Sequence, residues 1–152
     1  MIIKGKDGVT HINIYSQAET ELGIWLSNFT YSPITIPNDG EFNSIEGYWY
    51  WLFSKDDRLR SLVGFAAKSL GRSLVVGYEK NVDEDFKNKI RLAIDIKLKS
   101  NKEKMKEFYE SSLPFCHYYS YDGKKKDARY EWIIEHIEDR RSLLKKHFNN
   151  EK

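Results

Sequence analysis

The sequence predicts a mainly helical α+β fold, a single domain spanning residues 1–152 with a small antiparallel sheet near the N-terminus. Two observations support this. Strand-like stretches and turn residues fill the chain up to position 43, whereas helical periods of apolar side chains take over after Ser44. The segments between the expected helices are short and contain no Pro/Gly/Ser-rich linker, which favours one domain.

The expected strands form two hairpins. One joins residues 2–3 to residues 12–15 through an Asp-Gly turn, and the other joins residues 34–36 to residues 41–42 through Asn-Asp-Gly. Residues 115–121 are rich in aromatic side chains and are expected to form a strand that rejoins this sheet.

Apolar side chains recur at helical spacing in the rest of the chain. Ser44 is a good N-cap for the first helix, and Gly71 can end the second. We expect five helices, near residues 45–54, 58–70, 84–99, 102–111 and 127–147.

Composition excludes several classes of protein. Apolar residues make up 40% and charged residues 32% of the chain, values typical of a globular protein, and no apolar run reaches the length of a membrane helix. The lone cysteine and the lack of a signal-peptide core favour the cytoplasm. The four histidines lack paired metal-ligand spacing, so we expect neither metal nor cofactor. The net charge of +2 does not by itself indicate a nucleic-acid binder.

Glu46 is the principal candidate for a functional side chain. Trp49, Tyr50 and Phe53 follow it by three, four and seven positions, so all four side chains would share one helix face. Burial among aromatic rings raises a carboxyl pKa, which suits acid–base catalysis or binding of ribose hydroxyls. The structural interpretation is that Glu46 only favours the helix dipole from the first turn.

Three further segments contain candidate residues. Lys68 and Arg72 stand four positions apart and could hold a diphosphate, or could simply complement a helix C-terminus. Asn28, in the Ser-Asn-Phe segment, could offer its amide to a ligand or only stabilise a turn. His117 lies among tyrosines, where a histidine can bind a ligand or pack in the core.

Taken in order, these segments resemble the NADAR family, which includes the YbiA-type N-glycosidases. The resemblance begins at Ile14-Tyr15-Ser16 and runs through most of the chain. Its main motifs are the family's S-N-F, S-x-E-x-x-[YF] and A-K-x-L-G-R patterns, matched here by residues 27–29, 44–49 and 67–72. Residues 86–97 follow like the family's aromatic-to-lysine helix.

The resemblance implies an N-glycosidase acting on ADP-ribose or related ribosyl compounds. Glu46 matches the family's functional glutamate, and Lys68 is a candidate catalytic partner. The expected ligand-binding residues are Asn28, Phe29, Trp49, Arg72, His117 and Tyr118. The implied substrate is ADP-ribosylated guanine in single-stranded DNA, and the Lys/Asn-rich composition looks like that of a phage protein that counters a DarT-type ADP-ribosyltransferase toxin in the host cytoplasm.

The sequence departs from the family at two places. A lysine that serves some members as a Schiff-base nucleophile would fall at position 53, which is Phe53 here, and the C-terminal tryptophan–glycine motif is absent. Either Lys68 or Lys55 replaces that nucleophile, or Glu46 activates water directly. Two further functions are consistent with these departures: a non-catalytic module that binds ADP-ribose or the toxin, and an N-glycosidase of riboflavin-pathway intermediates.

Overall fold

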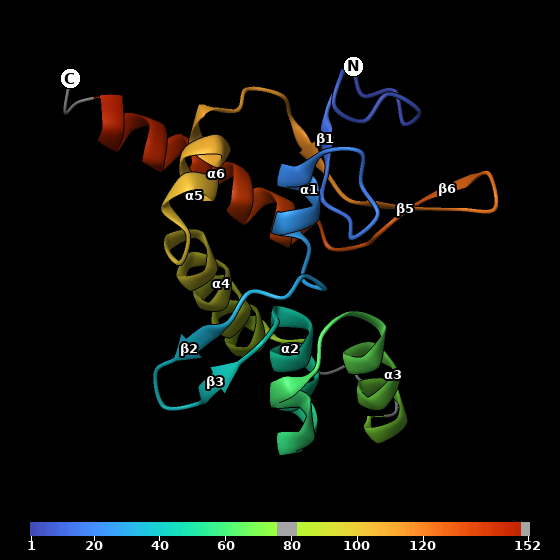
Figure 1. The fold of residues 1–152 in the computed structure, drawn as a ribbon, viewed down its shortest axis with the longest axis vertical. Coiled ribbons are helices and arrows are strands. Elements are labelled where there is room, and N and C mark those ends of the chain that lie inside the picture. Colours follow the sequence, from blue (N-terminus) through green and yellow to red (C-terminus); the bar gives the residue numbers. More distant parts are fainter. Residues whose placement is uncertain (76–81, 150–152) are drawn as a thin grey trace. The chain divides into compact units, whose positions relative to one another are not determined.

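A computed structural model describes residues 1–75 and 82–149 and confirms the mainly helical α+β fold (Figure 1). The chain divides into two compact units. The central unit is Asn28–Ser100, and the terminal unit combines Met1–Ser27 with Asn101–Lys152. The prediction that the chain is a single domain stays a prediction, and each unit is described by itself.

In its described residues, 28–75 and 82–100, the central unit combines one hairpin with three α-helices and a short 3-10 helix. Its strands pair antiparallel, with Ile34 opposite Phe42, so the second expected hairpin is confirmed. The elements are β2 (Ile34–Ile36), β3 (Gly40–Phe42), α2 (Ile45–Ser54), η1 (Asp57–Ser61), α3 (Gly64–Leu74) and α4 (Glu84–Lys99).

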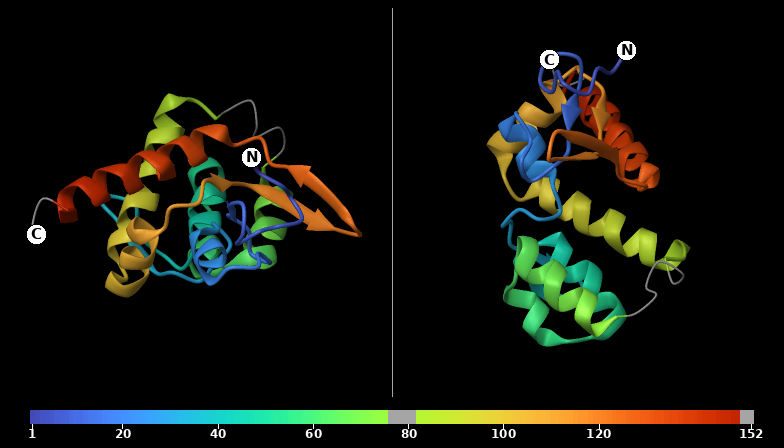
Figure 2. Two further views of the ribbon diagram at one scale, coloured as in Figure 1. Left: turned by 90° about the horizontal axis from the view of Figure 1, so that it is seen from above. Right: turned by 90° about the vertical axis from the view of Figure 1, so that its right-hand side faces the viewer.

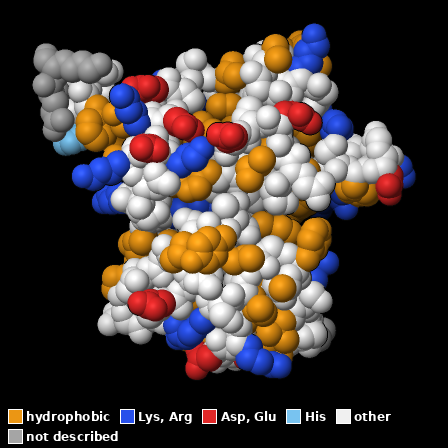
Figure 3. Space-filling model, in the orientation of Figure 1, with side chains coloured by type: hydrophobic (Ala, Val, Ile, Leu, Met, Phe, Trp, Pro, Cys, Tyr) orange, Lys and Arg blue, Asp and Glu red, His pale blue; other side chains and the backbone are white. Residues whose placement is uncertain are grey.

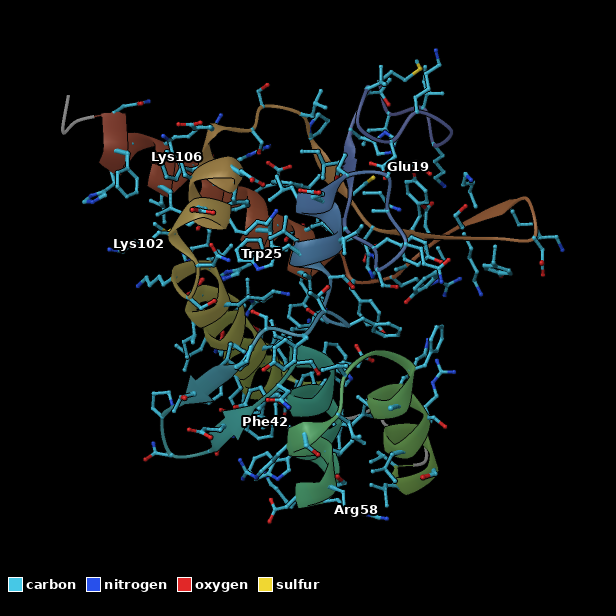
Figure 4. All side chains as sticks on the ribbon, viewed as in Figure 1. Glu19, Trp25, Phe42, Arg58, Lys102 and Lys106 are labelled. Carbon is cyan, nitrogen blue, oxygen red and sulfur yellow. The ribbon has the colours of Figure 1, made fainter. Side chains whose placement is uncertain are left out.

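Helix α2 is at the centre of this unit, because aromatic side chains surround it. Phe42 on β3, labelled in Figure 4, packs its ring 4.8 Å from that of Tyr48 and 5.3 Å from that of Trp51. On α4, Phe86 lies 4.7 Å from the ring of Trp49. The hairpin and α4 therefore both bury their apolar faces against α2.

A second feature of α2 is its close packing against α3, with the two helices side by side in Figures 1 and 2. Gly71 lies in the middle of α3, and a Cβ atom there would overlap with the ring of Tyr50. Gly47 on α2 likewise lies against the carbonyl oxygen of Leu59, with no room for a side chain. Two glycines thus set how near α2 approaches its neighbours.

The expected helix near residues 58–70 was wrong in its boundaries. The chain forms η1 first and then breaks at residues 62–63, before α3 begins at Gly64. Gly71 is buried within α3 rather than ending a helix. The apolar spacing of the segment is continuous and predicts one helix. Gly64 nevertheless has a φ of +55°, a left-handed conformation that interrupts a continuous α-helix at this position.

The terminal unit is built on a short parallel strand pair. Ile12 pairs with Phe115 and Asn13 with Cys116, which confirms the prediction for the start of the aromatic segment only, because residues 118–121 form a separate strand in another sheet. Its elements are β1 (Ile12–Asn13), α1 (Glu21–Leu26), α5 (Lys102–Glu110), β4 (Phe115–Cys116), β5 (Tyr118–Tyr121), β6 (Lys124–Asp127) and α6 (Glu131–Asn149).

The expected N-terminal hairpin was wrong. Residues 2–3 form no strand, and the Asp7 carboxylate instead accepts hydrogen bonds from the backbone N–H groups of Asn13 and Glu19, at 2.9 Å each. The turn after Asp7 is present, since the N–H of Gly8 donates to the carbonyl oxygen of His11, and the Asp7 side chain ties this turn to β1 and to the loop before α1. Helix α1 was not expected; its six residues are too few for a visible period, although Thr20 caps it by accepting from the N–H of Gly23.

The C-terminal helix also begins later than expected. Residues Lys124–Asp127 pair antiparallel with Tyr118–Tyr121, so α6 begins only at Glu131. A run of three lysines does not predict a strand. The segment is a strand because its backbone pairs with that of Tyr118–Tyr121. None of the described helices, in either unit, is long and apolar enough to cross a membrane.

Replacement of Gly71 with Ala tests the close packing of α2 against α3. The added methyl group overlaps with Tyr50, and we expect the free energy of unfolding to fall by about 1–3 kcal/mol despite alanine's better helix propensity. Urea unfolding measures this. Ser69→Ala, a position of the same helix with no part in that contact, should change stability by less than about 0.5 kcal/mol. A Gly71→Ala protein as stable as wild type would contradict the packing.

Candidate functional site

The Ser-Asn-Phe segment connects the beginnings of α2 and α3 through its backbone. The carbonyl oxygen of Asn28 accepts a hydrogen bond from the N–H of Glu46, at 3.0 Å. The next carbonyl, that of Phe29, accepts from the N–H of Gly64, also at 3.0 Å. The first turns of both helices are therefore tied to one loop, because two adjacent carbonyls bond to them.

Ser44 strengthens the same arrangement. Its hydroxyl accepts from the N–H of Gly47 at 3.1 Å, as the N-cap prediction requires, and donates to the carbonyl oxygen of Leu62 at 2.9 Å. One buried hydroxyl thus caps α2 and binds it to the segment before α3. Glu46 follows in the first turn of α2, in a position that this network fixes.

The carboxyl group of Glu46 is removed from water. Burial raises its pKa from 4.5 to about 7, and the positive charges of Lys68 and Arg72 lower the pKa and so offset part of that rise. Desolvation exceeds the attraction of both cations. At neutral pH the carboxyl group therefore exists in both protonation states, which is the condition for efficient proton transfer.

Of the two cations, Lys68 has the larger electrostatic effect on Glu46. Burial and the charge of Arg72 lower the pKa of the Lys68 ammonium group, while Glu46 raises it. Its Nζ atom lies 5.7 Å from the centre of the Phe29 ring. Lys68 and Arg72 both lie on α3, Lys68 half-buried and Arg72 exposed. Arg72 is in the last turn of the helix, as expected, whereas Lys68 lies before that turn.

The aromatic residues that follow Glu46 on α2 pack against neighbouring helices. Trp49 is only 5% exposed and contacts Phe86 edge to face. Phe53 stacks on the same Phe86 ring at 4.6 Å. Tyr50 is buried against Gly71. The helical spacing of these residues therefore reflects the packing of α2 against its neighbours. Ligand binding by Trp49 stays a prediction.

His117 and Tyr118 lie in the terminal unit. Tyr118 is 2% exposed, and its hydroxyl donates to the carbonyl oxygen of Lys4 at 2.7 Å and lies 2.7 Å from Nε2 of His11. The ring of His117 contacts that of Tyr119 at 5.4 Å. Both residues pack within their own unit, and their part in ligand binding stays a prediction.

The structure thus brings together five of the eight candidates. They are Asn28, Phe29, Glu46, Lys68 and Arg72, all in the central unit. Within the described residues, no group of three or more His, Cys, Asp or Glu side chains could hold a metal ion.

Two residues of the central unit were missed from the sequence. Phe65, in the first turn of α3, is 68% exposed, and its ring centre lies 5.3 Å from that of Phe29. A single exposed aromatic residue does not stand out in a periodic apolar pattern, so the sequence did not indicate it. Lys97 is 2% exposed, and burial lowers the pKa of its ammonium group to about 7. It stands on the apolar stripe of α4, four positions after Ala93, and that placement was the available signal.

No family model, no curated protein and no solved structure matches the chain. The resemblance to the NADAR family therefore rests on the ordered motifs alone. The site geometry is independent of that resemblance, because it comes from the contacts of the described residues.

The raised pKa of Glu46 predicts how stability depends on pH. Because the folded-state pKa, about 7, exceeds the unfolded value of 4.5, the folded protein binds more protons between these values. The contribution of this group to stability is therefore complete below pH 4.5 and is lost as the pH rises through 7. At pH 8 the Glu46→Gln variant should exceed wild type in free energy of unfolding by about 1–3 kcal/mol.

Urea unfolding at pH 4.5 and pH 8 measures this difference, which should be much smaller at the lower pH. Glu41→Gln provides the matched control, since Glu41 is an exposed carboxylate on β3 of the same unit. An equal effect of Glu46→Gln at both pH values would show that burial does not disfavour the charged carboxylate.

Proposed function

We propose that the chain is an ADP-ribosyl N-glycosidase that removes ADP-ribose from guanine bases in DNA. The observation that supports this most directly is the carboxyl group of Glu46, whose pKa is raised to about 7 beside two cations. A proton donor of this strength suits cleavage of an N-glycosidic bond, and a pair of cations suits a diphosphate. The ordered motifs that resemble the NADAR family supply the substrate class.

In the proposed reaction, Glu46 acts as the general acid. The bond between C1 of the ribose and the guanine nitrogen breaks, its electron pair stays on the nitrogen, and the nitrogen receives the Glu46 proton. Water then adds to C1 and gives its proton to the Glu46 carboxylate, which leaves free ADP-ribose, unmodified guanine and the restored acid. The carboxylate formed in the first step stabilises the positive charge that develops at C1.

The other residues would bind and orient the substrate. Arg72, an exposed residue, would form paired hydrogen bonds with one phosphate, and Lys68 would act on the other as a point charge. Asn28 would frame the ribose from the loop that positions Glu46. A DarT-type toxin would generate this substrate in the cytoplasm of a phage host.

Lys68 is also the residue best placed to serve as a nucleophile. Its pKa is lowered, so a larger fraction of its amine is neutral, and Glu46 lies close enough to influence that pKa. Lys55 is less suitable, because its Nζ atom lies 4.3 Å from the centre of the Trp51 ring in a cation–π contact. Borohydride trapping of an imine would distinguish attack by Lys68 from direct attack by water.

We expect the Glu46→Gln enzyme to cleave ADP-ribosylated single-stranded DNA roughly 10²–10⁴-fold more slowly than wild type. Mass spectrometry of the oligonucleotide measures the loss of ADP-ribose. Glu41→Gln is the control, and should cleave at the wild-type rate. Unfolding cannot explain a slow Glu46→Gln enzyme, because that variant should be the more stable protein at pH 8. Full activity in Glu46→Gln would refute the proposal.

The pH dependence of the wild-type rate tests the role of Glu46 separately. A general acid must be protonated, so kcat/KM should fall as the pH rises through about 7, and this decline should be absent from the residual activity of Glu46→Gln. If Glu46 instead activated water as a base, the rate would rise through the same pH range.

One observation favours a second function, a non-catalytic module that binds ADP-ribose or the toxin. The position of the family's nucleophilic lysine is Phe53, and its ring stacks on Phe86 in the packing between α2 and α4. Calorimetry would reveal tight binding of ADP-ribose without any product after long incubation. Cleavage of ribosylamino-pyrimidines, tested in parallel, would indicate a riboflavin-pathway substrate instead.

A further inference from the structure

We propose that Phe65 forms a stacking site for a nucleobase of single-stranded DNA, next to the carboxyl group of Glu46. This inference rests on the proposed function and adds to it how the unmodified part of the substrate is held. Three features support it: the exposure of Phe65, its contact with the ring of Phe29, and the two cations that follow Phe65 along α3.

Phe65 is exposed but held in place. With 68% of the residue exposed, most of its ring surface faces solvent. The ring of Phe29 contacts it edge to face, at 5.3 Å between centres and 75° between planes. Since the Phe29 carbonyl also accepts from the N–H of Gly64, the two phenylalanines are linked by both backbone and side chain. A ring held this way loses little entropy when a base stacks on it.

The face of α3 that carries Phe65 also carries two cations. Lys68 and Arg72 follow Phe65 by three and seven positions, so their side chains share its side of the helix. In Figure 3, hydrophobic side chains reach the surface of the central unit next to Lys and Arg side chains. A nucleotide supplies an aromatic base and a phosphate together, which suits an exposed ring that shares its helix face with two cations.

Lys68 links the aromatic pair to the reacting group. Its Nζ atom lies over the Phe29 ring, and its charge also lowers the pKa of the Glu46 carboxyl. A strand whose modified guanine is held at Glu46 can therefore place a neighbouring base on Phe65. Such stacking tolerates any base, because every base has an aromatic face.

Binding of unmodified single-stranded DNA tests the site without any turnover. Fluorescence anisotropy of a labelled oligonucleotide should show about tenfold weaker binding by Phe65→Ala than by wild type, whereas Phe65→Trp should bind at least as well as wild type. An oligonucleotide of the same length with abasic residues should bind wild type and Phe65→Ala equally, since it retains only the phosphates. ADP-ribose, titrated by calorimetry, should bind wild type and Phe65→Ala alike.

Leu74→Ala is the matched control. Leu74 is 37% exposed and follows Phe65 by nine positions on the same helix, which places it on the opposite side of α3. This variant removes exposed apolar surface away from the proposed site and should bind the oligonucleotide as wild type does. Equal weakening by both substitutions would overturn the proposal, because the effect would then not depend on the side of α3 that carries Phe65.

The remaining outcomes separate this site from the proposed activity. Weak oligonucleotide binding by Phe65→Ala, combined with no cleavage by wild type, would support the base site and refute the glycosidase. Normal oligonucleotide binding by Phe65→Ala, or no binding of single-stranded DNA by wild type, would overturn the base site whether or not cleavage occurs. Loss of ADP-ribose binding in Phe65→Ala would also overturn it, by assigning Phe65 to the sugar nucleotide instead.

Discussion

The close approach of α2 and α3 is the constraint on which the candidate site depends. Gly71 allows α3 to lie directly against the ring of Tyr50, and Lys68 and Arg72 are on that same helix, one turn or less from Gly71. A side chain at Gly71 would push the helices apart by roughly the width of a methyl group. The cations would then move away from Glu46, and their electrostatic effect would weaken with both distance and entering water. Backbone packing thus determines the electrostatics of the site.

The same packing creates an energetic conflict that is typical of functional sites. A carboxyl group whose pKa rises to about 7 has lost more hydration than the nearby positive charges restore. A chain selected only for stability would place an uncharged side chain here, or would expose the carboxylate. The N-cap of Ser44 and the hydrogen bonds of the Asn28–Phe29 backbone hold the first turn of α2 in place despite this cost. These hydrogen bonds therefore keep the Glu46 carboxyl group in a buried position where desolvation disfavours its charged form.

Local signals predicted well the elements that have both a cap and a long apolar period. Helix α2 begins after Ser44 and ends at Ser54 as expected, and α4 spans Glu84–Lys99 as expected, with Asp83 as its N-cap. The failures have several physical causes: partner strands that the local pattern does not identify, the left-handed backbone of Gly64 between η1 and α3, and segments too short to show a period. Strand β1 pairs with β4 across about a hundred residues, and β6 becomes a strand only because β5 lies beside it. Neither the polar Lys124–Asp127 segment nor the six-residue α1 carries enough periodicity to be recognised in isolation.

For the candidate site, the sequence by itself determined which side chains are present, the order of the motifs and the place of Glu46 in a capped first helical turn. Those properties depend on neighbours within a few positions along the chain, and local rules describe them. Only the tertiary structure decided that the carboxyl of Glu46 is desolvated, that Trp49 and Phe53 pack against Phe86, and that Phe65 stays exposed beside Phe29. The burial of these side chains and the distances between charges depend on how α2, α3 and α4 pack together. The spacing of residues along the sequence does not specify how closely helices pack.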